Sequence, residues 1–263
     1  MARGAAFFDL DKTLMEGSSA IHFGRAAYRA GMMSRRQLLA DLWANVRFRL
    51  EGASDEATSA LRQRILDELS GVKVRDLARL GPEVLAGILP RIYSTVLEAA
   101  YEHQDAGRPA YVVTAASQEL AELLAHVLVL DGAIGTRSEV RDGAYTGNPE
   151  GPFVYGEGKA VAIRVMAERE GLDLAESWAY SDSASDLPML QAVGHPVVVN
   201  PDANLERIAK DQGWDVLRFD KLGRRLRIAA GAAALAAIAG AGGYASARLR
   251  PKSRIRRLRP AWP

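Results

Sequence analysis

Short apolar runs alternate with helical patterns along this 263-residue chain, and the alternation restricts its fold more than any other feature. Strand-like runs lie at residues 5–8, 110–113, 177–180 and 196–199, and helical patterns lie at 118–130, 159–170 and 186–192. Strands that alternate with helices favour a parallel sheet with helices on both faces. We therefore predict an α/β fold with a doubly wound parallel sheet, which binds ligands where its strands end.

The stretch after the first strand interrupts this pattern with long amphipathic segments. Helical periodicity is clear over residues 35–50 and 58–69, and another helix is expected over 91–105. We interpret this stretch as a helical cap inserted into the sheet domain. The expected division is a core from residues 1–16 and 108–220, a cap with its connecting helix from 17–107, and a tail from 221–263. Glycine and turn residues predict a hairpin over 132–152.

The tail carries the basic character of the chain. The 34 Lys and Arg residues nearly balance 32 acidic ones, yet after Phe219 the only acid is Asp220. Residues 228–247 carry no charge, consist mostly of Ala and Gly, and have the length of a membrane span, with arginines on both sides. Three interpretations follow: a membrane span, a helix on an anionic membrane surface, and a soluble tail.

Cysteine is absent, which excludes disulfides, zinc–thiolate sites and thiol catalysis. The first residues lack the basic and then apolar pattern of a secretory leader. We therefore expect a cytoplasmic catalytic domain whose route to a membrane, if it has one, is the tail. The body before the tail is mildly acidic, and we expect no nucleic-acid partner.

Four polar clusters stand at expected strand ends and helix starts. They are Asp9 with Asp11, Thr114 with Ala115, Lys159, and Asp182 with Asp186. Each cluster alone is typical of a turn, a helix cap or a solvated surface. Together and in this order they supply a nucleophile, an anion-binding group, a charge-neutralising group and a metal site. Phosphoryl transfer needs all four, and a hard cation such as Mg²⁺ takes oxygen ligands.

These motifs resemble those of the haloacid dehalogenase superfamily, subfamily IB, whose best-known members are phosphoserine phosphatases. The resemblance rests on the run Asp9-Leu10-Asp11-Lys12-Thr13-Leu14, on Thr114, on Lys159 after Gly-Glu-Gly, and on the run from Ser181 through Leu190. It covers roughly residues 5–205, and the motifs are specific in combination. The helical insertion also matches the cap position of that subfamily.

The resemblance implies a phosphatase mechanism with named roles. Asp9 would attack phosphorus and form an aspartyl-phosphate, and Asp11 would protonate the leaving oxygen and then deprotonate the attacking water. The Asp9 carboxylate, the Asp11 backbone carbonyl and Asp182 would hold Mg²⁺. Asp186 would support the metal's waters or orient Lys159.

The remaining motifs would bind the anion. Thr114 and the adjacent backbone N–H of Ala115 would bind phosphate oxygens, and Lys159 would neutralise the charges of nucleophile and phosphate. The implied function is Mg²⁺-dependent hydrolysis of a small or membrane-associated phosphomonoester.

Phosphoserine phosphatase itself is the alternative in the same class. Those enzymes carry a Glu after the first motif that meets the substrate ammonium. Ungapped spacing places Ser18 there, with Glu16 as the nearest acid. Arg64 matches the cap arginine that meets the substrate carboxylate, but the phenylalanine seven positions earlier is Ala57 here. A solvated helix face is the other interpretation of Arg64.

Two alternatives belong to other classes: a signalling receiver domain and a catalytically idle regulator on this fold. Receivers also combine an acceptor Asp, Mg²⁺, a Thr and a Lys, but they lack an acid two residues after the acceptor and have no cap. Asp11 and the insertion therefore argue against a receiver. An idle protein has no physical need for the complete set of charges, so the motifs favour an enzyme.

Overall fold

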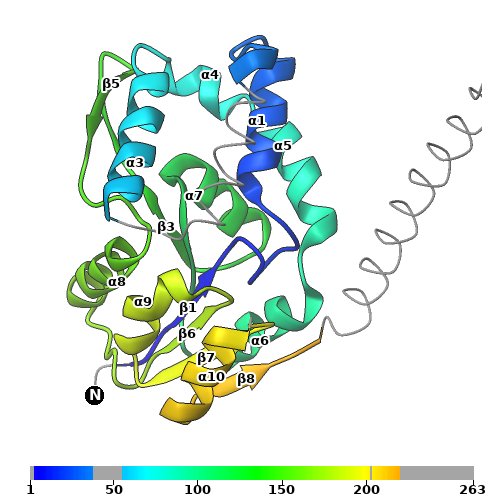
Figure 1. Cartoon of the computed structure of the whole chain (residues 1–263), viewed down its shortest axis with the longest axis vertical. Coiled ribbons are helices and arrows are strands. Elements are labelled where there is room, and N and C mark those ends of the chain that lie inside the picture. Colours follow the sequence, from blue (N-terminus) through cyan, green and yellow to red (C-terminus); the bar gives the residue numbers. More distant parts are fainter. Residues whose placement is uncertain (1–2, 38–54, 202, 220–263) are drawn as a thin grey trace, which may run out of the picture. The chain divides into compact units, whose positions relative to one another are not determined.

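The computed structural model describes residues 3–37, 55–201 and 203–219 (Figure 1). Its main sheet has six strands in the order β3-β2-β1-β6-β7-β8. The strands are β1 (Ala6–Asp9), β2 (Ala110–Ser117), β3 (Gly132–Thr136), β6 (Trp178–Ser181), β7 (His195–Val199) and β8 (Asp215–Leu217). Every pairing in it is parallel. The predicted doubly wound α/β sheet is confirmed, with β1 between β2 and β6.

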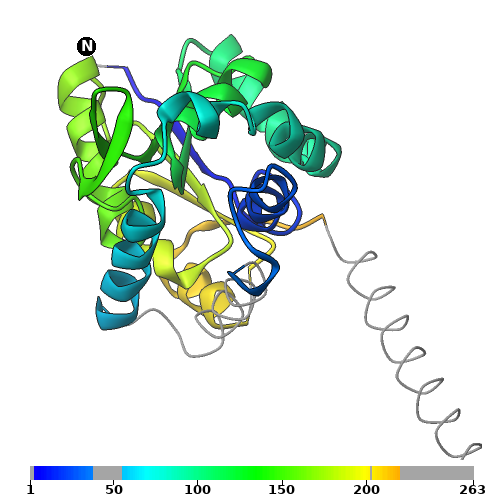
Figure 2. The same cartoon turned by 90° about the horizontal axis from the view of Figure 1, so that it is seen from above.

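Helices flank the sheet and extend beyond it, as two perpendicular views show (Figures 1 and 2). Between β1 and β2 the chain forms α1 (Ser19–Arg29), α3 (Asp55–Leu69), α4 (Val74–Ala78), α5 (Gly81–Ile88), the 3₁₀ turn η1 (Leu89–Arg91) and α6 (Ser94–Asp105). After β2 it forms α7 (Gln118–Val127), α8 (Glu157–Glu170), the 3₁₀ turn η2 (Ala184–Asp186), α9 (Leu187–Gln191) and α10 (Ala203–Gln212). The named elements of the predicted insertion are therefore all helical in the described residues.

The central strand is buried on both faces. Phe7 belongs to a core cluster that includes Ile163 of α8. Phe8 points to the other face, where its ring stacks on Tyr180 with centroids 4.4 Å apart and meets His103 of α6. A strand covered on both faces carries apolar side chains until it ends, and its polar residues therefore begin at its carboxyl end.

A separate hairpin joins the insertion to the rest of the chain. It consists of β4 (Ser138–Arg141) and β5 (Ala144–Pro149). The Gly71 N–H donates to the Tyr145 carbonyl at 2.8 Å, and the Tyr145 N–H donates to the Val72 carbonyl at 2.9 Å. The segment between α3 and α4 thus extends the hairpin. The prediction of a hairpin over 132–152 was partly wrong, because residues 132–136 pair with β2 as a strand of the main sheet.

Several expectations changed in detail or fall outside the described residues. The helix expected over 186–192 is a 3₁₀ turn followed by the short α9, and α10 and β8 were not predicted. Most of the expected helix over 35–50 and the whole segment 228–247 lie outside the described residues. Within the described part, no helix is long and apolar enough to cross a membrane. The division into core, cap and tail stays a prediction.

Candidate active site

The order of the strands brings three predicted clusters to one edge of the sheet. Asp9 is paired with the residue before Thr114 on β2. The residue before Asp9 is paired with Tyr180 on β6, so Asp182 follows just past the end of that strand. Because neighbouring parallel strands end at the same edge, Asp9, Thr114 and Asp182 meet there.

The remaining cluster, Lys159, reaches this edge from α8. Lys159 lies in the first turn of the helix and is 3% exposed. Its ammonium donates to Asp9 Oδ1 at 2.5 Å and to Asp186 Oδ2 at 2.7 Å. A buried charge needs such partners, because desolvation without them is costly. Lys159 therefore joins the nucleophile candidate of β1 to the acid pair after β6.

Two glycines allow the chain to bury this lysine. A Cβ at Gly158 would lie 1.8 Å from the carbonyl oxygen of Phe153, so no larger residue fits. Gly156 has φ +55° just before the helix, a conformation that residues with a Cβ rarely adopt. The Gly-Glu-Gly-Lys cluster is thus a tight turn that directs its lysine inward.

Asp186 has one oxygen with two donors and one with none. Ser181 Oγ donates to Asp186 Oδ2 at 2.7 Å, the same oxygen that Lys159 contacts. Asp186 Oδ1 is buried and has no hydrogen-bond partner among the described residues. Leaving a buried acceptor unsatisfied costs about 1–3 kcal/mol. The arrangement therefore suits a further bound group on this side of Asp186.

Negative charge is in surplus at this site. Burial raises the pKa of Asp9 to about 8; Lys159 opposes the rise, and Asp186 and Asp182 add to it. Burial also raises the pKa of Asp182 to about 6, against the opposing charge of Lys12. Burial alone would lower the pKa of Lys159, but Asp186 and Asp9 outweigh it and raise that pKa above its usual value. A cation would offset the surplus.

The residues fit a hard divalent cation. Mg²⁺ keeps several waters and is usually bound through one or two carboxylates. The described residues contain no group of three or more His, Cys, Asp or Glu side chains that could hold a metal ion. A site that uses two carboxylates and one backbone carbonyl, as predicted here, agrees with that finding. The charge surplus and the partnerless Asp186 oxygen support the fit.

A family model described as haloacid dehalogenase-like hydrolase matches residues 6–191. The chain belongs to this family. The phosphoserine phosphatase SerB1 of Mycobacterium tuberculosis (strain ATCC 25618 / H37Rv) is 40% identical over 245 residues, which cover 92% of this chain and 79% of that protein. The histidinol-phosphatase of Neisseria meningitidis serogroup C (strain 8013) is 32% identical over 222 residues, covering 82% of this chain and 99% of that protein.

A solved structure supports the same family fold. It is a protein of unknown function from Bordetella pertussis Tohama I, with 29% identity and a TM-score of 0.72. The match covers 82% of this chain and 99% of that chain. The family model and the phosphatase names of the relatives assign this haloacid dehalogenase-like hydrolase to the phosphoric monoester hydrolases.

In this hydrolase, Asp11 follows β1, and its carboxylate contacts the start of α1. Ser18 Oγ donates to Asp11 Oδ2 at 2.7 Å, and the Ser19 N–H donates to Asp11 Oδ1 at 2.8 Å. Spacing placed Ser18 where phosphoserine phosphatases carry their ammonium-binding Glu. Its hydroxyl contacts the acid of the first motif.

The second motif differs from its expected local structure. Thr114 is buried, and its Oγ1 accepts a hydrogen bond from the Ala116 N–H at 3.2 Å. The predicted helix start at residue 118 is confirmed, but the expected strand end at Val113 was wrong, because β2 continues to Ser117 with a register shift after Val113. Ser117 then caps α7 by accepting from the Leu120 N–H at 3.4 Å. Thr114 and the half-buried Ala115 thus lie on an irregular strand end instead of a helix terminus.

Arg64 stands apart from this geometry. It lies on α3, and its Nε pairs with Glu68 at 3.2 Å with both side chains 37% exposed. The neighbouring Arg62 donates to the Gly151 carbonyl at 3.0 Å. These contacts match the surface interpretation of the two arginines, and the substrate role of Arg64 stays a prediction.

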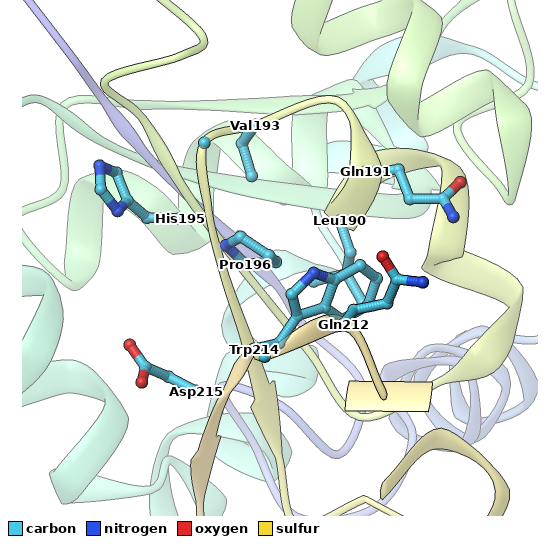
Figure 3. Close-up of a pocket in the computed structure, with 10 residues that line it drawn as sticks. Leu190, Gln191, Val193, His195, Pro196, Gln212, Trp214 and Asp215 are labelled. Atoms are coloured by element: carbon cyan, nitrogen blue, oxygen red, sulfur yellow. The ribbon is translucent and has the colours of Figure 1, made fainter. Parts of the chain in front are cut away.

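A cavity of about 350 Å³ lies at the opposite edge of the sheet, where β7 and β8 begin (Figure 3). Trp214, His195 and Gln212 line it together with Gln191. It includes no residue of the four predicted clusters, so it is not the family site.

Supporting residues were missed by sequence reasoning. Thr13 is fully buried, and its hydroxyl accepts from the Asp182 N–H at 2.9 Å, which joins the first motif to the fourth. Ser181 holds Asp186 as described. Thr13 and Ser181 both lie in the motif runs named above, next to the acids. That position in the sequence is the signal that could have identified them. The contact of Ser18 with Asp11 had no such signal, because the two residues lie seven positions apart around a turn.

Proposed function

We propose that this chain is a Mg²⁺-dependent phosphomonoester hydrolase that forms a covalent aspartyl-phosphate on Asp9. The observation that carries the proposal is the buried Lys159, which bridges Asp9 and Asp186 where the central strand of the sheet ends. A carboxylate can approach an anionic phosphate only when nearby cations offset the repulsion.

The first step transfers the phosphoryl group to the enzyme. A carboxylate oxygen of Asp9 attacks phosphorus while the bond from phosphorus to the leaving oxygen breaks. Asp11 donates its proton to that oxygen, so the product leaves as an alcohol. Lys159, already on Asp9 Oδ1, holds the nucleophile in place and offsets the charge that gathers around it.

The second step releases inorganic phosphate. Asp11, now a carboxylate, removes a proton from a water that attacks phosphorus, and the bond to Asp9 breaks. Thr114 and the backbone N–H of Ala115 hold the phosphate oxygens through both steps. Asp186 keeps Lys159 oriented through their 2.7 Å contact.

A Mg²⁺ ion would supply positive charge to the phosphate oxygens in both steps. The side chains of Asp9 and Asp182 and the carbonyl of Asp11 would hold it, with Asp186 supporting its waters. The surplus of buried negative charge and the partnerless Asp186 oxygen support this assignment.

We propose a small phosphomonoester other than phosphoserine as the best substrate. The relatives carry two substrate names, phosphoserine and histidinol phosphate, so their names support a phosphoester without choosing one. Ser18 is 2% exposed and bonded to Asp11, which supports the absence of a dedicated ammonium site at this position. Phosphoserine phosphatase remains the alternative, with Arg64 as its carboxylate-binding candidate.

A receiver or an idle regulator is less well supported than an enzyme. An acid two residues after the acceptor and a helical insertion are both present, and receivers lack both. The core and cap division and a membrane contact of residues 221–263 are likewise proposals, and the catalytic steps depend on neither.

The test is the Asp9→Asn variant, assayed for phosphate release from p-nitrophenyl phosphate with Mg²⁺. Activity should fall by roughly 1000-fold or more, because Asn keeps the shape but loses the nucleophile. The fold should survive, since Asn removes a buried charge without changing volume. Asp105→Asn, an exposed acid at the end of α6, is the matched control. Near-wild-type activity of Asp9→Asn would refute the mechanism.

A further inference from the structure

Ser18 occupies the N-cap position of α1 but does not cap the helix. It has extended backbone angles (φ −134°, ψ 128°), as an N-cap residue does, yet its side chain makes no capping bond. An N-cap serine normally accepts a hydrogen bond from an N–H of the first turn. Here the hydroxyl donates to Asp11 Oδ2 at 2.7 Å instead. The side chain is thus diverted from helix stability to the acid of the first motif.

A second donor reaches the other oxygen of the same carboxylate. The Ser19 N–H, at the first position of the helix, donates to Asp11 Oδ1 at 2.8 Å. The torsion that rotates a carboxylate has broad, shallow preferences. One donor leaves that rotation partly free, whereas two donors on two oxygens define the plane of the group. The backbone donor is fixed by the helix, whereas the Ser18 hydroxyl is a contact that a substitution can remove.

We propose that Ser18 is a positioning residue that orients the Asp11 carboxyl for proton transfer to the leaving oxygen. The inference rests on the proposed function, in which Asp11 is the acid. A hydroxyl suits the task because it can donate to a carboxylate and rotate when the group gains its proton. A carboxylate has about four acceptor positions, and these two bonds occupy one on each oxygen.

The role predicts a dependence on the leaving group. When an alkyl phosphate is cleaved, the leaving group is a strongly basic alkoxide unless its oxygen is protonated. The cleavage therefore needs a well-placed acid. The p-nitrophenolate ion is stable without a proton, so cleavage of p-nitrophenyl phosphate needs the acid much less. A purely structural role would reduce the rates on both substrates equally. The ratio of the two rates therefore isolates the orientation of Asp11.

The experiment measures kcat/KM of Ser18→Ala with Mg²⁺ on p-nitrophenyl phosphate and on the best alkyl phosphate from a phosphoester panel. The value of kcat/KM depends only on the steps up to and including the first irreversible one. The later action of Asp11 on water therefore does not affect it. Ser177→Ala is the matched control. Ser177 is also buried and its hydroxyl makes two hydrogen bonds, but it precedes β6 at the opposite edge of the sheet. Asp11→Asn provides the reference for a lost acid.

Ser18→Ala should lose about 10- to 100-fold on the alkyl phosphate, the effect of one charge-assisted hydrogen bond, and less than about three-fold on the aryl phosphate. Ser177→Ala should leave the ratio unchanged. Adding Ser18→Ala to Asp11→Asn should cause no further loss, because the two residues act as one unit. Equal losses on both substrates, or no loss on the alkyl phosphate, would overturn the proposal.

Two measures keep the outcome readable. If Ser18→Ala does not fold, Ser18→Cys replaces it, since a thiol has similar size but is a weak donor. The same bias toward the aryl phosphate is then expected, and its absence counts against Ser18. If the wild-type protein hydrolyses neither substrate, or Asp9→Asn stays active, the proposed function fails, and that result is distinct from a failure of the Ser18 proposal.

Discussion

The buried His103 should link the stability of the fold to pH. Its side chain lies on α6 against the sheet and is 6% exposed. Arg108 Nε donates to His103 Nδ1 at 2.8 Å, and His103 Nε2 lies 2.9 Å from the Tyr180 hydroxyl. A guanidinium can only donate, so Nδ1 is the acceptor and Nε2 carries the proton. Burial lowers the pKa of His103 to about 4, and the charges of Arg108 and His195 act in the same direction.

The magnitude follows from the difference between folded and unfolded pKa values. The unfolded value is 6.5, so between pH 6.5 and about 4 the unfolded chain binds more protons than the folded one. The free energy of unfolding therefore decreases as the pH falls, by up to about 1.4 kcal/mol per pH unit. The full contribution, about 3 kcal/mol, is present above pH 6.5 and is lost by about pH 4. This is a large share of a typical stability of ~5–15 kcal/mol.

The assay is urea unfolding of wild type and His103→Gln at several pH values between about 7.5 and 4.5. Other groups, including those of the active site, titrate alike in both proteins. Their contributions cancel in the difference between the two free energies of unfolding. The stability advantage of the wild type should shrink by about 1 kcal/mol per pH unit below pH 6.5. His126→Gln, an exposed histidine, should keep the wild-type slope. A difference between wild type and His103→Gln that is constant over this range would refute the reasoning.

Three further outcomes are expected. Val129 follows the C-cap of α7 with φ +56° and is 73% exposed, so Val129→Gly should stabilise the protein by about 0.5–1 kcal/mol in urea unfolding. Val127→Gly, at the last position of the helix, should instead destabilise it by roughly 0.3–0.5 kcal/mol. A destabilised Val129→Gly protein would contradict this account of strain. Phosphoserine should not be the best substrate in a phosphoester panel, and a screen that ranks it far above the others would overturn that expectation. The full chain should fractionate partly with membranes, but a version truncated at Leu222 should not; a wholly soluble full chain at low salt would eliminate both membrane interpretations.

The sheet class and the strand-end acids could be predicted from local pattern. Asp9 and Asp182 each follow an apolar run, and a strand buried on both faces must end where polar residues begin. Alternation of strands and helices then implied a parallel sheet. The strand β8 could not be predicted in this way. It has three residues, two of them exposed, and it is a strand because β7 offers an edge for pairing.

The predicted hairpin shows a similar limit. Residues 132–136 look like the first arm of a hairpin because glycines and turn residues follow them. In the structure they pair with β2, where Gly132 and Ile134 lie opposite Tyr111 and Val113, and the hairpin forms only from β4 and β5. Turn residues indicate where a chain reverses. The partner of a strand depends instead on apolar side chains that are distant in sequence and pack against that strand.

By itself, the sequence determined which polar groups lie at the strand ends, and therefore the family and its chemistry. Only the tertiary structure decided which of those groups meet. Lys159 reaches Asp9 across 150 positions because α8 packs on the sheet and Gly158 admits a close turn. Spacing placed Ser18 where the family's ammonium-binding Glu is missing, and only the fold brings its hydroxyl to Asp11. A hydrogen bond requires placement within tenths of an ångström, and such placement comes from packing between elements, which no local pattern of residues encodes.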